Sequence, residues 1–185
     1  MTYLEYANWV PLPAPVTSGS GVQSFTAPDG EVWVAKNGVN SGNWFKARDV
    51  LHARYYRSAA YSFPTTQTIM LFDTVVRDPY GLYNAGTGYV TLPVAGSWFF
   101  HCVTGGSATA ASQFIQHIWT LNDTNQFEST TVYSPGAVGF SVNTAASRFF
   151  NSGDRLSLVT RASVAMVMST SNENNCISAD YLGSG

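Results

Sequence analysis

Charge is scarce in this sequence, and lysine is nearly absent. Charged residues make up 11% of the 185 residues and the net charge is −2, whereas charged residues make up roughly 25% of a typical soluble domain. The only lysines, Lys36 and Lys46, lie in the first third. Nucleic-acid-binding proteins need a basic stripe, so this balance excludes nucleic acid as a partner. A low charge content also fits a chain that buries surface in an oligomer, because such interfaces are depleted of charged residues.

Long apolar runs, an export signal and a cysteine framework are missing too. No run approaches the roughly 20 apolar residues that a membrane helix needs, and residues 1–5 lack the basic and apolar parts of a signal peptide. We therefore expect synthesis in a cytoplasm, without membrane insertion or export by the usual route. Cys102 and Cys176 have neither a disulfide nor a metal-binding spacing, so we expect two buried, reduced thiols.

The signatures of common enzymes are also absent. The sequence has no Gly-x-Ser-x-Gly elbow, no glycine-rich phosphate loop and no His-Glu-x-x-His. His101 and His117 lie in β-like runs and could meet across a sheet, but histidines satisfied in a core or groove are the preferred interpretation. A calcium site is not favoured, because an aspartate in a turn already serves as a side-chain acceptor. The aspartates concerned are Asp73, Asp78, Asp123 and Asp154. We predict a protein that is not an enzyme and has no cofactor.

The beginning of the chain is expected to form an extended arm followed by a hairpin. Three prolines at alternate positions of residues 9–15 exclude a helix, and residues 17–21, made of Thr, Ser and Gly, indicate a flexible link. Residues 31–36 and 42–47 are predicted as two strands of a hairpin, because turn dipeptides flank them. A lone hairpin is marginal in water, so it should pack on a neighbour.

Further along, short strands alternate with turns, which is typical of a sandwich or barrel. Residues 49–63 are ambiguous: Asp49 could cap a helix that extends to Arg54, whereas the aromatic residues that follow favour a strand. Strands are predicted at 69–76, 89–92, 96–103, 114–121, 137–142, 146–150, 156–160, 164–168 and 176–182. Loops are expected at 78–88, 104–112, 123–134 and 169–175.

Residues 58–185 carry an ordered set of short motifs. They are the small-aromatic run 59–63, Leu71-Phe72-Asp73, Tyr83-Asn84, Thr87-Gly88-Tyr89, the turn Pro93-Val94-Ala95-Gly96, Trp98-Phe99-Phe100, Gly153-Asp154 and the closing strand 176–182. Together they resemble the globular head of complement component one, subcomponent q (C1q), a family that shares its fold with tumour necrosis factor (TNF). The resemblance implies an all-β, ten-stranded type of jelly-roll sandwich. One departure is that Ile177-Ser178-Ala179-Asp180-Tyr181 replaces the family's usual Phe-Ser-Gly-Phe.

The resemblance also implies a homotrimer, because the family packs three jelly rolls around a three-fold axis. The head is rich in aromatic residues, and exposed aromatic patches mark interfaces. By family position, Tyr61, Phe63 and Tyr181 are expected at the trimer interface. The alternative is that all the aromatic side chains belong to an ordinary core.

Residues 1–57 resemble, less specifically, segments that precede such heads in proteins of tailed bacteriophages. We therefore expect residues 1–57 to attach the chain to a virion, with Trp9, Trp33 and Trp44 as attachment residues, and residues 58–185 to form the head. This predicts a virion surface protein, either a capsid decoration or a tail-tip or fibre protein, with other virion structural proteins and a host-surface glycan as partners. The alternatives are a secreted or cell-surface ligand module and, third, a capsule-degrading enzyme.

Overall fold

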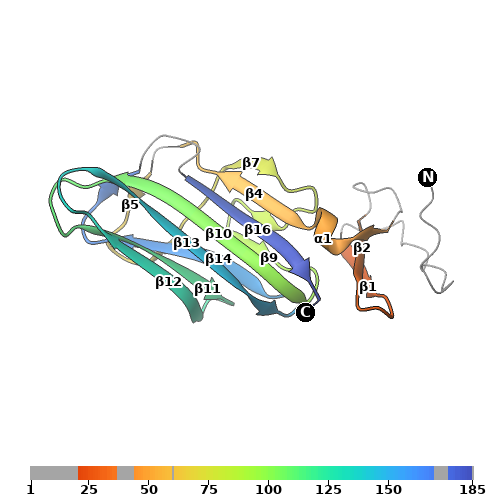
Figure 1. Ribbon diagram of the computed structural model, residues 1–185. Coiled ribbons are helices and arrows are strands. Elements are labelled where there is room, and N and C mark those ends of the chain that lie inside the picture. The colour runs from red at the N-terminus through yellow and green to blue at the C-terminus, as the bar shows by residue number, and fades with distance from the viewer. Residues whose placement is uncertain (1–20, 37–43, 60, 169–174, 185) are drawn as a thin grey trace.

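Two antiparallel β-sheets face one another across a shared core (Figure 1). The computed structural model describes residues 21–36, 44–59, 61–168 and 175–184. The first sheet has five strands in the spatial order β13-β10-β16-β4-β7. These are β4 (His52–Tyr56), β7 (Thr74–Arg77), β10 (Gly96–Ser107), β13 (Gly139–Phe150) and β16 (Asn175–Gly183).

The second sheet has six strands, five of them in the order β12-β11-β14-β9-β8, with β6 also paired to β14. They are β6 (Thr68–Ile69), β8 (Tyr83–Asn84), β9 (Tyr89–Thr91), β11 (Phe114–Leu121), β12 (Asn125–Tyr133) and β14 (Arg155–Ala162). A two-stranded pair, β5 (Ser62–Phe63) and β15 (Met166–Val167), lies beside these sheets. The long strands come from regions where the sequence alternates apolar and polar residues, which places one side of each strand in the core.

Aromatic rings fill the space between the sheets. Trp98 and Phe100 from β10 and Trp119 from β11 are fully buried. The Phe100 ring lies 5.5 Å from the ring of Trp119 and 5.5 Å from that of Phe150, in tilted and edge-on arrangements. Such pairs stabilise a core beyond the area that they bury. Aromatic side chains from the two sheets therefore pack together in one continuous apolar layer.

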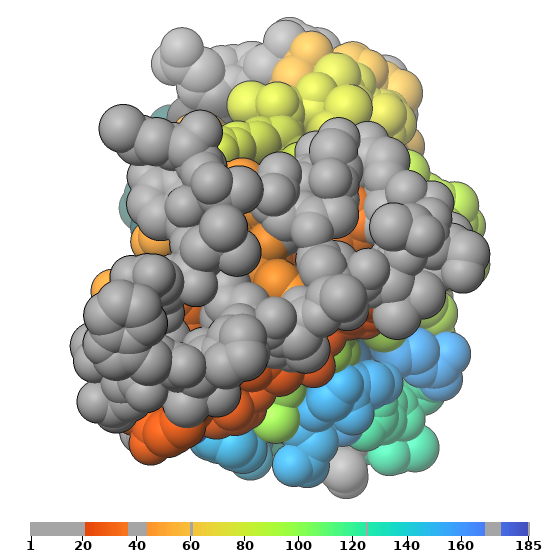
Figure 2. All heavy atoms as spheres, turned by 90° about the vertical axis from the view of Figure 1, so that its right-hand side faces the viewer, coloured from red at the N-terminus to blue at the C-terminus, as the bar shows by residue number. Residues whose placement is uncertain are grey.

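A small sheet of β1 (Val22–Thr26), β2 (Val32–Lys36) and β3 (Phe45–Lys46) lies at one end of the sandwich, where β16 ends (Figure 1). Seen from that end, atoms of β1, in red, lie directly beside atoms of the head (Figure 2). Lys36 donates a hydrogen bond to the carbonyl of Tyr80 at 2.6 Å, and Ser184 donates to that of Gly30 at 2.6 Å. Val34 is fully buried in the common core. The predicted hairpin of β2 and β3 is confirmed, and it packs on the head as a lone hairpin must.

Pairing resolves the ambiguous segment 49–63 and corrects other predicted bounds. The possible helix through Arg54 is limited to α1 (Ala47–Val50), because the strand β4 starts at His52 and pairs with β16 and β7. The sheet of the head therefore begins before residue 58. The predicted strand 69–76 is split into β6 and β7, because the chain crosses there from one sheet to the other.

The predicted loop 123–134 is mostly the strand β12, which pairs with β11. The two strands predicted at 137–142 and 146–150 are one strand, β13. The strand predicted at 114–121 is confirmed with its bounds. The loop predicted at 169–175 lies almost wholly outside the described residues.

Candidate functional site

The outward side of the five-stranded sheet, here called the five-stranded face, carries an open hollow. In β10 the buried Trp98 and Phe100 alternate with Phe99 and His101, which point outward. In β16 the core side chains Ile177, Ala179 and Tyr181 alternate with Cys176, Ser178 and Asp180. Strand parity thus decides which side chains reach this face.

Two cross-strand rows build the polar part of the five-stranded face. In the first row Ser178 lies opposite His101 on one side and Arg54 on the other, and Arg54 lies opposite Arg77. In the second row Asp180 lies between Phe99 and His52. The rows combine four strands that are far apart in the sequence. They place two guanidinium groups, two imidazoles and one carboxylate on one surface.

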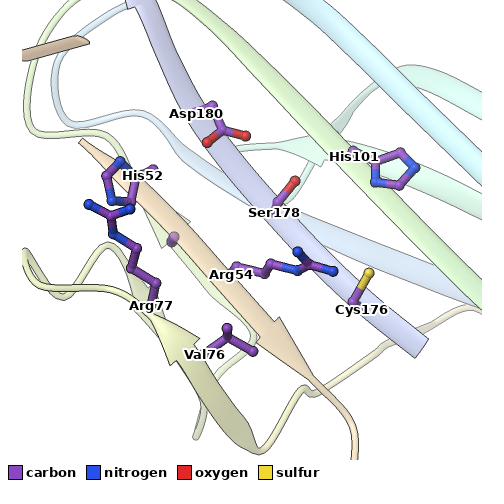
Figure 3. Close-up of a pocket in the computed structure, with 9 residues that line it drawn as sticks. His52, Arg54, Val76, Arg77, His101, Cys176, Ser178 and Asp180 are labelled. Atoms are coloured by element: carbon purple, nitrogen blue, oxygen red, sulfur yellow. The ribbon is translucent and has the colours of Figure 1, made fainter. Parts of the chain in front are cut away.

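These side chains line an open cavity of about 530 Å³ (Figure 3). Figure 3 shows the Arg77 side chain beside the ring of His52, with Asp180 on the neighbouring strand. Cys176, Ser178 and Val76 complete the lining. Within the residues that the structure describes, Arg54 and Arg77 form no ion pair. Like charges directly opposite one another destabilise a sheet, so this pair calls for a negative partner.

Burial and charge act on the titratable groups of the cavity. Burial, together with the nearby Arg77, lowers the pKa of His52. Burial raises the pKa of Asp180, while His52, Arg54 and His101 act in the opposite direction. The buried Nε2 atom of His52 has no hydrogen-bond partner among the described residues. The cavity is therefore cationic in balance, and it leaves polar groups unsatisfied within one chain.

Apolar side chains remain exposed at both edges of this sheet. Val75 and Val76 of the edge strand β7 are 56% and 57% exposed, and Phe149 of the opposite edge strand β13 is 52% exposed. Large apolar side chains at such exposure often mark a contact surface when they cluster with unsatisfied polar groups. The five-stranded face has both features.

Of the three residues predicted for the trimer interface, two are buried within their own chain and one is partly buried. Phe63 is fully buried and Tyr181 is 3% exposed, both within their own chain. Tyr61 is partly buried and packs edge-on against Phe63, with 5.4 Å between the ring centroids. Phe63 and Tyr181 therefore have almost no surface left for a partner. The side chains that β16 presents outward are Ser178 and Asp180, which sequence reasoning missed; the strand's alternation was the signal that could have found them.

Of the three predicted attachment residues, the structure describes Trp33 and Trp44. Trp9 lies outside the described residues. Trp44 packs edge-on against Phe25 at 4.9 Å between ring centroids, and Trp33 stacks near the same ring at 6.5 Å. The amine of Lys46 lies 5.7 Å from the Trp33 ring. The two tryptophans thus hold the small sheet together, and their role in attachment stays a prediction.

The cysteines and histidines are separated by the sheet. Cys102 points into the core and Cys176 points outward, although they lie on the neighbouring strands β10 and β16. Both thiols are free, and burial raises the pKa of Cys102. His101 lies on the outward side, whereas His117 is fully buried and its Nε2 lies 2.8 Å from the Thr104 hydroxyl. The two histidines therefore do not meet, and His117 is a core histidine whose Nδ1 atom has no hydrogen-bond partner among the described residues.

The four aspartates considered for calcium already accept hydrogen bonds, Asp78 and Asp154 from their own turns and Asp73 and Asp123 from more distant residues. Asp73 accepts from the backbone and hydroxyl of Ser58, and Asp78 accepts from the backbone of Leu82 and Tyr83. Burial would raise the pKa of Asp73, but the hydrogen bonds lower it to about 2. Among the described residues, no group of three His, Cys, Asp or Glu side chains is arranged to hold a metal ion.

Comparisons with known proteins identify the fold. No family model matches the chain, and no curated protein matches it. The globular domain of zebrafish complement 1qA protein superposes with a TM-score of 0.56 and 14% identity, over 72% of this chain and 98% of that one. Murine APRIL at pH 5.0 superposes with a TM-score of 0.56 and 13% identity, over 71% and 98%.

At these identities the likeness concerns the fold alone. It confirms the all-β jelly roll of the C1q/TNF type. The described part of the chain also contains no helix with the length and apolar character needed to cross a membrane.

Proposed function

We propose that this chain is a non-enzymatic binding module that forms a homotrimer, and that a virus particle carries it on its surface as a capsid decoration or a tail-tip or fibre protein. The observation that carries the trimer is the five-stranded face, with its unpaired Arg54 and Arg77 and its exposed apolar edges. The observation that supports a binding role is the C1q/TNF-type fold. The virion role is supported by the resemblance of residues 1–57 to segments of tailed-phage proteins.

A closed ring of three copies joins two different surfaces at each contact, because only a two-fold axis pairs a surface with itself. The two long edges of this sandwich differ in the required way. One edge, formed by β4 and β7, carries Arg54, Arg77 and the exposed Val76. The other, formed by β13 and β12, carries the exposed Phe149 and the exposed carboxylate of Glu128. Figure 1 shows β7 and β12 on opposite sides of the molecule.

Glu128 offers the negative charge that would neutralise Arg54 and Arg77 of a neighbouring copy. Its side chain forms no ion pair within the described residues and only accepts a hydrogen bond from the backbone of Ser129. In the proposed trimer, Glu128 of one copy lies against Arg77 of the next, and Phe149 packs against Val76. Charge complementarity fixes the register of such contacts, and apolar burial supplies most of their affinity.

A charge swap tests this contact. The wild-type chain of 20.0 kDa should sediment at about three times the subunit mass, and Arg77→Glu and Glu128→Arg should each reduce the mass to that of one subunit, because each places like charges together. The double variant Arg77→Glu/Glu128→Arg should restore the trimer. Asp49→Arg reverses an exposed charge on α1 and should leave the mass unchanged. A single-subunit mass for the wild type would refute the trimer, and a trimer in all variants would refute this interface.

Attachment to a particle is tested separately. Deletion of residues 1–21 should prevent incorporation into particles and leave a soluble trimer. Cryo-microscopy of particles should locate the head on the capsid or at the tail. Incorporation of the truncated chain would overturn the attachment role of this segment.

A secreted or cell-surface ligand module is the second candidate, and the similarity to the zebrafish complement 1qA globular domain favours it. The two candidates differ in where the chain is found. Antibody-gold labelling of particles distinguishes them, because only the virion role predicts gold on the particle surface.

A further inference from the structure

A second hollow lies on the outward side of the six-stranded sheet, here called the six-stranded face. It has a volume of about 310 Å³, which is at the lower end of the range for small-ligand sites. Its lining comes from the turn between β11 and β12 and from β6, β9 and β14. The five-stranded face lies on the other side of the sandwich, and of the proposed assembly contact only the β12 edge with Glu128 lies near this hollow.

The turn that forms one wall is rigidly built. Asn122 and Asp123 both have positive φ, at 51° and 70°, which is the geometry of a tight hairpin turn that Asn and Asp tolerate. The side chain of Asn122 accepts a hydrogen bond from the backbone of Arg155 and donates one to Asp154, both at 2.9 Å. The turn is therefore tied to the start of β14 and holds Asp123 in place.

The carboxylate of Asp123 is neutralised within the pocket. The Tyr89 hydroxyl donates a hydrogen bond to one oxygen, and Arg155 forms an ion pair with the other at 2.7 Å. The guanidinium of Arg155 also lies over the Tyr89 ring, 4.9 Å from its centroid. The hydrogen bond to Asp123 raises the pKa of Tyr89. These contacts leave a polar wall with no net charge, in contrast to the cationic cavity of the five-stranded face.

Apolar and hydroxyl groups form the rest of the hollow. Ile69 and Val159 contribute apolar surface. The buried hydroxyls of Thr120 and Ser157, which also line the hollow, form a hydrogen bond with each other at 2.7 Å. Two side-chain amides, those of Gln67 and Gln126, line the rim and have no hydrogen-bond partner within the described residues. Each such amide offers two donors and an acceptor with two lone pairs.

We infer that this pocket binds a neutral sugar residue. A sugar has hydroxyl groups that both donate and accept, together with apolar C–H faces, and the free amides and the Ile69–Val159 surface complement these features. A phosphate, a sulfate or an acidic sugar would need an unpaired cation, and Arg155 is already paired with Asp123. The inference deepens the proposed binding role, since it gives a module on a particle surface a glycan as its ligand. Three copies would turn three weak contacts into useful avidity.

Saturation-transfer NMR with the full chain tests the site. The probes are the methyl glycosides of glucose, galactose, mannose and N-acetylglucosamine, with glucuronic acid as the charged comparison, each at millimolar concentration. At least one neutral glycoside should receive saturation, and glucuronic acid should not. Gln67→Ala and Gln126→Ala should each weaken binding about five-fold, the effect of one net hydrogen bond. Both residues are exposed, so the fold should persist in these variants.

Gln23→Ala, the same change in β1, is the matched control and should bind as the wild type does. Because the pocket is complete within one chain, the single-subunit variant Arg77→Glu should keep the intrinsic affinity, which separates failure of this site from failure of the trimer. Absence of saturation for all four neutral glycosides would overturn the inference. So would a preference for glucuronic acid, or binding that the double variant Gln67→Ala/Gln126→Ala leaves unchanged.

Discussion

The two outward faces of the sandwich differ in whether the charged groups that line their cavities form ion pairs among the described residues. On the five-stranded face, Arg54 and Arg77 lie opposite one another without an ion pair among the described residues. On the six-stranded face, Asp123 is bonded by Tyr89 and Arg155, and Arg161 donates to Gln116 at 2.6 Å. The cavity of the five-stranded face thus has unpaired cations among the described residues, whereas the charged groups of the pocket on the six-stranded face are paired.

The difference indicates two kinds of partner. An incomplete charged surface flanked by exposed apolar side chains is stabilised when a complementary protein surface covers it. A neutral, ordered pocket holds its groups ready for a small ligand and loses little entropy when the ligand binds. The fold thus places the cationic cavity and the recognition pocket on the outward sides of different sheets, and only the β12 edge with Glu128 belongs both to the proposed assembly contact and to the sheet that carries the pocket.

The largest expected effect tests whether β10 has one side in the core and the other on the five-stranded face. Trp98→Ala should lower the free energy of unfolding by about 3–5 kcal/mol, because a fully buried indole is replaced by a cavity. As the variant unfolds in urea, assembly and sugar binding should be lost together with the fold. Phe99→Ala, the next residue and on the outward side, should cost only about 1 kcal/mol. Urea unfolding followed by fluorescence and circular dichroism measures both; equal costs would contradict the assignment of the faces.

The next largest effect concerns pH: acid should lower the free energy of unfolding because His117 is buried in its neutral form. Burial lowers the pKa of His117 from 6.5 to about 3. Below pH 6.5 the unfolded chain binds a proton that the folded chain does not, so stability falls as the pH falls from 6.5 towards 3. At 1.36 kcal/mol for each pH unit, the loss reaches about 3 kcal/mol at pH 4.

Urea unfolding at several pH values measures this loss. His117→Gln should flatten the dependence, whereas His101→Gln, at the outward cavity, should leave most of it. If His117→Gln fails to fold, NMR titration of the wild-type imidazole provides the readout, and it should stay neutral at pH 5. An imidazole of His117 that titrates near pH 6.5 would contradict the prediction.

The sequence predicted the fold where strands are long and alternate clearly. The segments 96–103, 114–121 and 176–182 were recognised because each is a short run rich in apolar and β-favouring residues, with turn residues between such runs. β12 was missed because its sequence is polar, with Ser129, Thr130 and Thr131 in the middle; an edge strand needs only one apolar side. The crossover within 69–76 is invisible in the sequence, because both halves are apolar and only their partners differ.

To predict the site, one must know on which side of the sheet each side chain lies, and this is harder to infer from sequence than the position of a strand. Tyr181 and Asp180 are neighbours in the sequence, yet one enters the core and the other lines the outward cavity. An offset of one residue exchanges the two sides of a strand, so the side on which a residue lies has to be known before it can be assigned to the core or to the cavity. The pairing of Arg54 with Arg77 joins segments that only the folded sheet brings together.

The smallest expected effect tests the order of the six-stranded face itself. Asp123→Asn replaces the charged acceptor of the hydrogen bond that raises the pKa of Tyr89, so that pKa should fall towards the ordinary value of 10.0. Asp123 is exposed, so the free energy of unfolding should change by no more than about 0.5 kcal/mol. NMR titration of the Tyr89 ring carbon follows the ionisation directly, with Tyr133, an exposed tyrosine of β12, as internal control. An unchanged pKa for Tyr89 would mean that the bond to Asp123 does not persist in solution, and the contrast between an ordered face and an incomplete one would then lose its basis.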